Sequence, residues 1–394
     1  MNPSLINVCL LLAVGLVRGD DIQTLSSASS DFSQRLYQKV ALDNVNVVYS
    51  PYSIHSALSM TSLGAREETA TEFAKVLGVT ALTGNRAHLA YRDLITQLNN
   101  VTTVKLNTAN ALFVNPNIPI EQQFVSDARS YYLAKSSNFD LAAVGGPEKE
   151  INDYVEDKTH GIIKDLLPKG SVDASTVTVL INTIFFNGTW QIQFQAGDTQ
   201  IKDFQKLGGT KSKVSMMYDE RYVNIKRNVL GVDVAELPFK GNRFSLYIAL
   251  PNTVDGITDL ESTLLVPGNV DKLFQGLTPH HVRLSIPKFK IESSIGLKTP
   301  LQQLGLQKPF DPSTANFQGI SSAAKVVISD VLHKAVIDVK ETGTVAAAAT
   351  AVIGVKITAV LEPPAETFNA DHSFVFFLRD KQTNHTLFQG KFSG

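Results

Sequence analysis

Residues 341–370 constrain the fold more than any other part of the chain, because they join two strand-forming segments through a stretch of conflicting character. Residues 346–349 are four alanines, which favour a helix, whereas residues 352–360 are rich in Val, Ile and Thr, which favour a strand. The flanking segments 326–339 and 374–379 both have the composition of strands. A connection of this length is longer than most loops, and such connections tend to be functional or disordered.

The alternate side chains of this segment share an unusual property, since all are small and uncharged. They are Thr344, Ala346, Ala348, Thr350, Val352 and Gly354. Alternate residues of a strand lie on one face, so this face could enter a packed interior without burying a charge. Taken alone, the segment leaves open a second interpretation, a flexible Ala-rich surface loop.

The rest of the chain predicts a mixed α+β fold in one large domain, because helical patterns concentrate before residue 170 and strand patterns after it. Residues 177–186 and 374–378 are almost wholly apolar, which predicts strands buried on both faces. The predicted helices cover residues 27–40, 53–63, 86–99, 121–134 and 151–167. The predicted strands cover residues 104–114, 176–186, 232–237, 244–250, 282–286, 326–339 and 374–379.

The first nineteen residues predict a secretory signal peptide. An apolar run at 5–17 is followed by Arg18, and Val17 and Gly19 are small enough for the recognition pockets of a signal peptidase. The alternative is a membrane anchor, but the run is too short to span a bilayer. Removal of residues 1–19 would leave a secreted chain, 20–394, without its single cysteine, Cys9, and so without disulfides or thiol chemistry.

Three sequons fit a secreted glycoprotein. The acceptor asparagines would be Asn100, Asn187 and Asn384. Asn187 lies at the end of a strongly apolar predicted strand, which makes it the weakest of these candidates.

Charge and motif content argue against several functions. The chain has 36 Lys and Arg against 37 Asp and Glu, a net charge of -1, which disfavours binding to nucleic acid or to a membrane surface. Residues 80–105 hold only Arg86, Arg92 and Lys105 as cations, too few for a heparin-type stripe.

The motifs of catalysis and metal binding are missing as well. We find no phosphate loop, nucleophile elbow, dinucleotide fingerprint or zinc signature, and therefore expect neither a metal nor a cofactor. His280 and His281 are the only adjacent histidines, and neighbours on a strand point to opposite faces. A hydrolase remains open only because a triad can be assembled in space from distant residues.

Ten segments share a pattern with one known family, namely residues 46–60, 64–69, 151–155, 159–162, 182–190, 236–239, 317–321, 333–335, 374–379 and 387–390. Together these segments resemble the serpin family. Glu67 stands where that family usually has glycine, and Gln389 stands where it usually has methionine.

The resemblance implies a monomeric single domain with three β-sheets, about nine α-helices and an exposed reactive loop. It also implies a protein that is not an enzyme but a suicide substrate of serine proteases. The protease cuts the loop and forms an acyl-enzyme, and the freed loop then inserts as a new strand of the main sheet, which deforms the attached protease. A non-inhibitory serpin acting as carrier or chaperone is the alternative.

The resemblance places the hinge and reactive loop at residues 341–367. The hinge has the small residues typical of inhibitors, although Thr342 and Val345 replace common glutamates. Its residues are Glu341, Gly343, Thr344, Val345, Ala346, Ala347, Ala348 and Ala349. Counting seventeen residues from Glu341 predicts cleavage between Ile357 and Thr358, which suits an elastase-like protease. Cleavage one residue earlier, between Lys356 and Ile357, would suit a trypsin-like protease.

The resemblance also assigns two polar groups within the main sheet. Ser50, Ser53, Asn182 and His333 would form a shutter, the cluster beneath the point where the sheet opens. Trp190, together with a salt bridge between Lys288 and Glu341, would form the breach, the place where the loop first enters.

Overall fold

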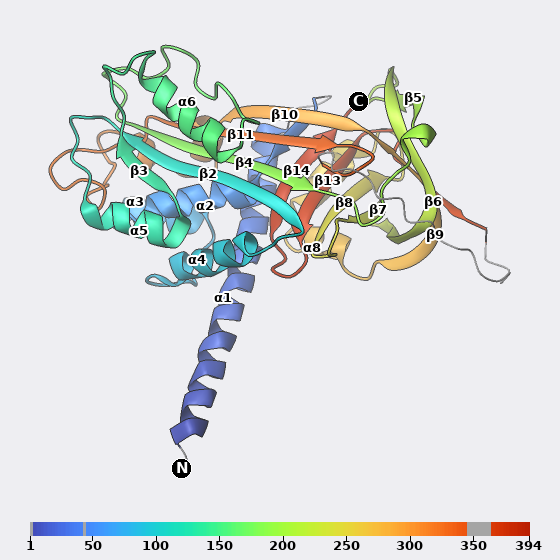
Figure 1. The fold of residues 1–394 in the computed structure, drawn as a ribbon, viewed down its shortest axis with the longest axis horizontal. Coiled ribbons are helices and arrows are strands. Elements are labelled where there is room, and N and C mark those ends of the chain that lie inside the picture. Colours follow the sequence, from blue (N-terminus) through green and yellow to red (C-terminus); the bar gives the residue numbers. More distant parts are fainter. Residues whose placement is uncertain (1–2, 42–44, 345–363) are drawn as a thin grey trace.

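The computed structural model describes residues 3–41, 45–344 and 364–394 of the chain, and in these ranges it confirms the α+β class (Figure 1). The described ranges contain nine α-helices and fourteen strands. The helices are α1 (Pro3–Val40), α2 (Pro51–Ser62), α3 (Glu67–Val76), α4 (Arg86–Asn99), α5 (Gln122–Tyr132), α6 (Pro147–Lys158), α7 (Ile257–Leu264), α8 (Asn269–Phe274) and α9 (Lys298–Gln303).

A five-stranded sheet forms one half of the molecule. Its order is β10 (Phe289–Gly296), β11 (Asp330–Val339), β4 (Thr178–Gly188), β2 (Val104–Val114) and β3 (Lys135–Asn138). Strands β11 and β4 run parallel, with Cα partners from Asp330↔Val179 to Val336↔Phe185. As predicted from its apolar sequence, β4 is central and buried along nearly its whole length.

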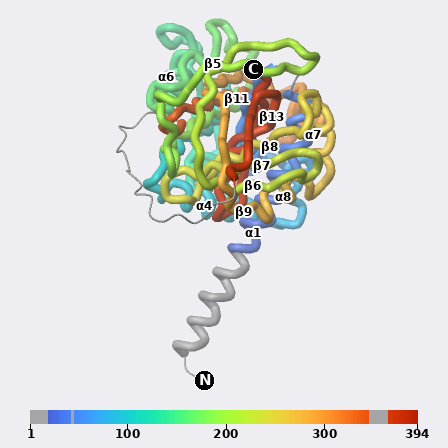
Figure 2. Tube along the Cα trace, turned by 90° about the vertical axis from the view of Figure 1, so that its right-hand side faces the viewer, coloured from blue at the N-terminus to red at the C-terminus, as the bar shows by residue number. Residues whose placement is uncertain are grey.

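The other strands form a second, nine-stranded sheet. Its order is β1 (Val47–Tyr49), β14 (Thr386–Phe392), β13 (Phe374–Asp380), β8 (Phe244–Pro251), β7 (Val232–Pro238), β6 (Lys211–Val229), β9 (Thr278–Pro287) and β12 (Glu366–Asn369), with β5 (Gln200–Gln205) also on β6. Figure 2 shows β13, β8, β7 and β6 in this succession.

The long strand β6 explains why two hydrogen-bonded sheets appear where three were expected. Its end at residues 224–229 pairs with β7, its middle at 216–225 pairs with β9, and its start pairs with β5. The expected second and third sheets therefore share β6 and become one continuous ladder.

Helices cover both faces of the five-stranded sheet (Figure 1). On one face α6 closes a small core with the sheet, in which Ile151 and Val155 pack with Phe113, Val179 and Ile181. On the other face lies the main core, which includes α2, where eleven residues from Pro51 to Thr61 are buried. Both faces of the sheet are thus covered by packed side chains.

Two predicted helices have different ends from those expected. The segment 151–167 was predicted as one helix, but α6 ends at Lys158, because His160 and Gly161 take left-handed backbone angles of φ 52° and 78°. Helix α1 begins at Pro3 rather than at residue 27, and Ile22 and Leu25 already contribute to the core before Phe32 and Leu36.

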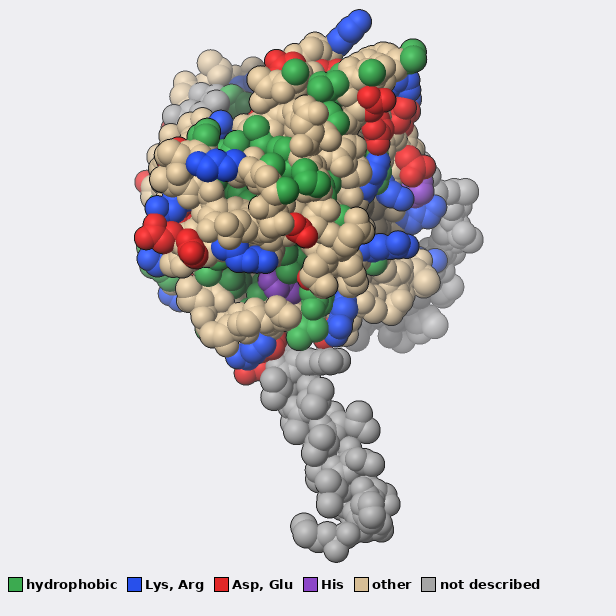
Figure 3. Space-filling model, turned by 90° about the vertical axis from the view of Figure 1, so that its left-hand side faces the viewer, with side chains coloured by type: hydrophobic (Ala, Val, Ile, Leu, Met, Phe, Trp, Pro, Cys, Tyr) green, Lys and Arg blue, Asp and Glu red, His purple; other side chains and the backbone are tan. Residues whose placement is uncertain are grey.

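The surface carries both signs of charge. On the face shown in Figure 3, basic and acidic side chains are interspersed among apolar and neutral ones. Within the described part of the chain, no helix has the length and apolarity to cross a bilayer, and no three His, Cys, Asp or Glu side chains are grouped to hold a metal.

Candidate functional site

The first residues of the hinge turn sharply back towards the five-stranded sheet after β11 ends at Val339. The N–H of Lys340 donates to the carbonyl of Gly343 at 2.8 Å, and the N–H of Gly343 donates back at 3.1 Å. Gly343 has φ +132°, and a Cβ at this position would lie 2.1 Å from the carbonyl oxygen of Gly188. Only glycine fits this turn without displacing the backbone of β4.

Thr344 follows the turn and lies against the end of β4. Its N–H donates to the Gly188 carbonyl at 2.7 Å, its hydroxyl accepts from the Gly188 N–H at 2.6 Å, and the residue is 0% exposed. Gly188 lies three residues beyond Phe185, the last residue of β4 that is paired with β11. Thr344 therefore occupies the place where these two strands diverge, at the end of the seam between them.

Trp190, a predicted residue of the breach, forms hydrogen bonds with the same turn. Its indole N–H donates to the Lys340 carbonyl at 2.8 Å, and its backbone N–H donates to Thr342 at 3.0 Å. The ring is stacked on Phe239 with 4.4 Å between centroids. Because Trp190 is nearly fully buried, this arrangement fixes the backbone immediately before Thr344.

Glu341 and Lys288, the predicted salt bridge, lie at ion-pair distance. Lys288 Nζ is 3.0 Å from Glu341 Oε2, and the Thr199 hydroxyl donates to Oε1 at 3.0 Å. Burial by itself would raise the pKa of Glu341. Hydrogen bonds from its own backbone N–H, Lys288 and Thr199 outweigh burial, so the pKa lies below its usual value. The carboxylate is therefore ionised at neutral pH.

The four predicted shutter residues meet under the β4–β11 seam. His333 of β11 and Asn182 of β4 are Cα partners, and His333 Nδ1 lies 2.7 Å from Asn182 Oδ1. The N–H of Ser50 donates to His333 Nε2 at 3.0 Å. Asn182 Nδ2 donates to the Ser53 carbonyl at 2.8 Å and to Asn110 of β2.

These contacts define the state of the imidazole. Nε2 accepts a hydrogen bond, so the proton is on Nδ1 and is donated to Asn182. Burial lowers the pKa of His333 to about 3, which keeps the ring neutral. A strand inserted between β4 and β11 would separate Asn182 from His333, so this hydrogen bond is one that insertion must exchange.

The sequons lie in different surroundings. Asn100 is the exposed C-cap residue that follows α4, and Asn384 is exposed in the turn between β13 and β14. Asn187 is half-buried in β4, opposite Lys105 and adjacent to Gly188.

The remaining reactive-loop predictions lie outside the described residues. They concern Val345, Ala346, Ala347, Ala348, Ala349, Lys356, Ile357 and Thr358. Conversely, the structure adds partners that the sequence did not indicate, namely Gly188, Thr199, Phe239 and Asn110. Each of these contacts a site residue more than forty positions away, so no local pattern could have identified them.

Comparison with known proteins defines the class. The family model described as serpin (serine protease inhibitor) matches residues 27–394, and the chain belongs to the serpin family. Curated relatives include human serpin B3, 33% identical over 94% of this chain and 100% of its own length. The leukocyte elastase inhibitor of Xenopus tropicalis is also 33% identical, with the same coverage.

Solved serpin structures share the fold. Serpin48 of the insect Tenebrio molitor has a TM-score of 0.84 and 32% identity, and the match covers 94% of this chain and 98% of that one. Human thyroxine-binding globulin, solved with its ligand, has a TM-score of 0.85 and 26% identity, over 95% and 99% of the two chains. The family thus includes both inhibitors and a ligand-binding protein.

Proposed function

We propose that this serpin inhibits serine proteases by inserting its cleaved loop between β11 and β4 while the protease is still attached as an acyl-enzyme. The observation that carries the proposal is the position of Thr344. It is buried at the end of the β4–β11 seam and already hydrogen-bonded to Gly188. On insertion, the residues after Thr344 would extend the hydrogen bonding that Thr344 already makes with Gly188 of β4.

Backbone hydrogen bonding supplies a driving force. A strand entering from Thr344 would run antiparallel to both neighbours and would replace one parallel ladder by two antiparallel ones, which are slightly more stable per residue. Each net backbone hydrogen bond contributes roughly 1 kcal/mol, so a strand of about ten residues gains on the order of 10 kcal/mol. The small alternate side chains of residues 344–354 limit the steric cost.

The shutter lowers the barrier to opening. His333 and Asn182 hold the seam by directional hydrogen bonds, and such groups can exchange partners one at a time when the strands part. If apolar side chains joined β4 and β11 at this place, their packing would be lost entirely before the inserted strand could make new contacts.

The proposed target is an elastase-like protease that cuts between Ile357 and Thr358. Ile357 suits a pocket for aliphatic side chains, and one relative is named leukocyte elastase inhibitor. Cleavage between Lys356 and Ile357 by a trypsin-like enzyme is the second possibility. Mass spectrometry of the released peptide distinguishes the two bonds. We further propose that the protein is secreted after removal of residues 1–19 and acts as a monomer.

The proposed mechanism is tested by incubating the protein with pancreatic elastase and, separately, with trypsin. Wild type should give an SDS-resistant band at the summed mass. Thr344→Arg should abolish the band while the loop is still cut, because position 344 is fully buried where the inserted strand would begin and a charged side chain cannot occupy it. Thr344→Ser, which keeps the hydroxyl, should retain the band. A band that persists in Thr344→Arg would contradict insertion.

A carrier is the second candidate, and one observation favours it. A cavity of about 240 Å³ lies beside α1 and α8, and its lining includes Ser30, Phe274 and Arg379. Arg379 is 7% exposed, and its Nε has no hydrogen-bond partner among the described residues. The protease experiment separates the candidates, because a carrier would be cut without forming the SDS-resistant band.

A further inference from the structure

Asn187 and Gly188 lie at the end of the β4–β11 seam, and they are the single Asn-Gly pair in the chain. Such pairs are especially prone to deamidation, because glycine has no side chain to keep its nitrogen away from the amide carbon of the preceding asparagine. Packing explains the glycine, since a Cβ at position 188 would lie 2.8 Å from both Phe186 Cε1 and Phe239 Cδ1. The core therefore requires glycine after Asn187.

The side chain of Asn187 is accessible to water. Asn187 is the single residue of β4 that is not buried. Its Cα partner is the exposed Lys105 of β2, and cross-strand partners lie on the same face of a sheet. A neighbouring cation favours the negative charge of a carboxylate at position 187. Asn187 and Gly188 also form the last two pairs of the β2–β4 ladder, where strands open most readily.

The hinge holds the other edge of this segment. Pairing of β4 with β11 ends at Phe185, so Asn187 and Gly188 lie beyond it. The N–H of Gly188 donates to the Thr344 hydroxyl at 2.6 Å, and the Gly188 carbonyl accepts from the Thr344 N–H at 2.7 Å. The nitrogen that would attack the Asn187 amide is thus the nitrogen that Thr344 holds.

We propose that Asn187 is a deamidation site that Thr344 protects while the hinge is docked on β4. When Thr344 leaves, the Gly188 nitrogen gives its proton to water and attacks the side-chain carbonyl carbon of Asn187. A C–N bond forms, the side-chain nitrogen takes up a proton and leaves as ammonia, and a succinimide remains. Water then opens the ring at either carbonyl and gives aspartate or isoaspartate, without any oxidant or reductant.

Isoaspartate at position 187 would disable the end of the seam. It adds one carbon to the main chain of β4 just before Gly188, which shifts Gly188 out of register with Thr344. Aspartate leaves the main chain unchanged. The consequence for inhibition rests on the proposed function, because register at Gly188 matters only if a strand enters there. Molecules with isoaspartate would then be cut by the protease without forming the SDS-resistant complex.

The test follows position 187 by mass spectrometry of proteolytic peptides while the full-length protein is held at neutral pH. The signals are the mass gained when the amide becomes a carboxylate and the separate elution of the isoaspartyl peptide. Thr344→Val removes the hydroxyl and keeps the shape of the side chain, whereas Thr344→Ser keeps the hydroxyl. Asn187→Gln removes the reactive amide, because glutamine would have to form a less favourable six-membered ring.

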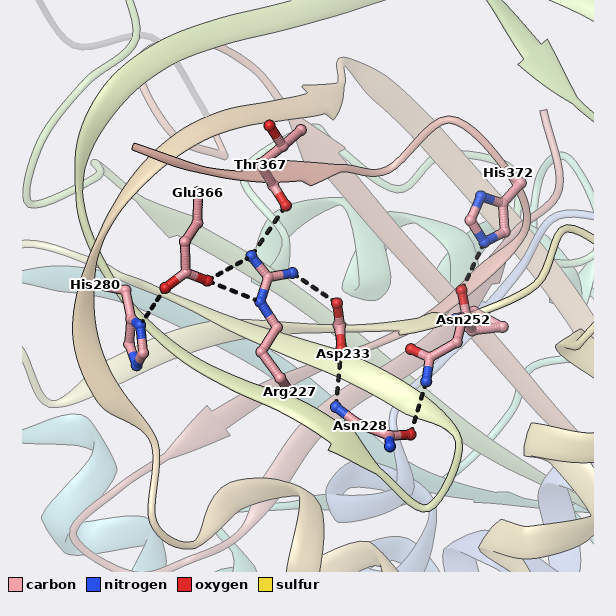
Figure 4. Close-up of polar contacts among 9 residues, drawn as sticks. Arg227, Asn228, Asp233, Asn252, His280, Glu366, Thr367 and His372 are labelled. Carbon is pink, nitrogen blue, oxygen red and sulfur yellow. Dashed lines mark hydrogen bonds and ion pairs between the residues drawn. The ribbon is translucent and has the colours of Figure 1, made fainter. Parts of the chain in front are cut away.

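Asn228, at the end of β6, provides an internal control in every sample (Figure 4). It is exposed, but its Oδ1 accepts from Asn252 Nδ2 at 2.9 Å, and its backbone N–H donates to Asp233 Oδ1 at 2.9 Å. The next residue, Val229, has a branched side chain that hinders attack by its nitrogen. Asn228 should therefore remain unmodified as long as the protein is folded.

Thr344→Val should acquire the modification at position 187 about fivefold faster than wild type, which corresponds to about 1 kcal/mol for the lost hydrogen bond. Thr344→Ser should match wild type. Equal rates in Thr344→Val and wild type, or no modification at position 187 in either protein, would overturn the proposal. A glycan on Asn187, or an equal acceleration at Asn228, would overturn it as well.

Complex formation with elastase and with trypsin is measured on the same samples. In wild type the SDS-resistant complex should fall in proportion to the isoaspartate fraction, whereas in Asn187→Gln it should not fall with time. Isoaspartate without loss of complex would overturn the effect on the seam. If fresh wild type forms no complex, the proposed function is wrong, but the mass spectra still decide whether Thr344 protects Asn187.

Discussion

At the scale of single residues, Glu67 departs from the family pattern, and the departure affects the strain of the backbone. Its backbone has φ +51°, in the left-handed region that side chains disfavour by roughly 1–2 kcal/mol. The family usually has glycine here. The Glu67 carboxylate offsets part of this backbone strain energy, because its Oε2 accepts a hydrogen bond from Asn316 Nδ2 at 3.2 Å.

Glu67→Gly should therefore stabilise the uncut protein by about 1 kcal/mol, because it relieves the backbone strain. The measurement is the free energy of unfolding of the uncut form in denaturant. Glu67→Ala is the control, since it removes the carboxylate and keeps the strain, and it should be no more stable than wild type. A glycine variant no more stable than the alanine variant would show that position 67 is unstrained.

Gln389 is the second residue that departs from the family pattern, and its hydrogen-bond partners could not be predicted from the sequence. It is fully buried and forms a reciprocal pair with Gln34, at 3.0 Å and 3.1 Å, while the Ser33 hydroxyl donates to its Oε1 at 2.7 Å. The replacement of methionine was visible in the sequence. Its compensation was not, because the partners lie more than 350 residues away.

At the scale of elements, the sequence predicted those whose pattern is set by their own burial. Strand β13 is buried along its whole length and β4 along nearly all of it, and both were predicted as buried strands. Strand β6 was missed, because its half-exposed residues give no clear alternation. The predicted strand 326–339 begins only at Asp330, although Val326 and Ile328 are buried. Burial there comes from tertiary packing, which a local pattern does not distinguish from pairing.

Buried neutral histidines contact neighbouring helices and loops, and this makes the stability of the folded protein sensitive to acid. His55 of α2 lies 2.8 Å from the Leu77 carbonyl, and His88 of α4 lies 2.6 Å from the hydroxyl of Tyr132 of α5. Burial lowers the pKa to about 4 for both. Burial likewise lowers the pKa of His333 and of His385, which lies before β14, to about 3.

Stability should therefore fall as the pH is lowered from about 6.5 towards 4. In that window the unfolded chain binds protons that the native histidines exclude, so each such histidine contributes a slope of up to about 1.4 kcal/mol per pH unit. Denaturant unfolding between pH 7 and 4.5 measures the slope. His88→Gln should reduce it, whereas His160→Gln, at an exposed residue, should not. A slope that His88→Gln leaves unchanged would show that His88 titrates alike in both states.

At the scale of the whole molecule, the proposed function requires the five-stranded sheet to accept a sixth strand between β4 and β11. Thr344 is buried where β4 and β11 diverge, and the shutter holds the seam by hydrogen bonds between His333, Asn182 and α2. The described residues thus support an account in which chain connectivity prevents the uncut protein from reaching its most stable form.

The melting temperature of the protein cut within residues 356–358, compared with that of the uncut protein, tests this account most directly. On the order of 10 kcal/mol of added strand pairing should raise the melting temperature by more than about 10 °C. The same cut in Thr344→Arg should give little increase. If cut and uncut wild type melt at the same temperature, the loop does not enter the sheet, and the account is wrong.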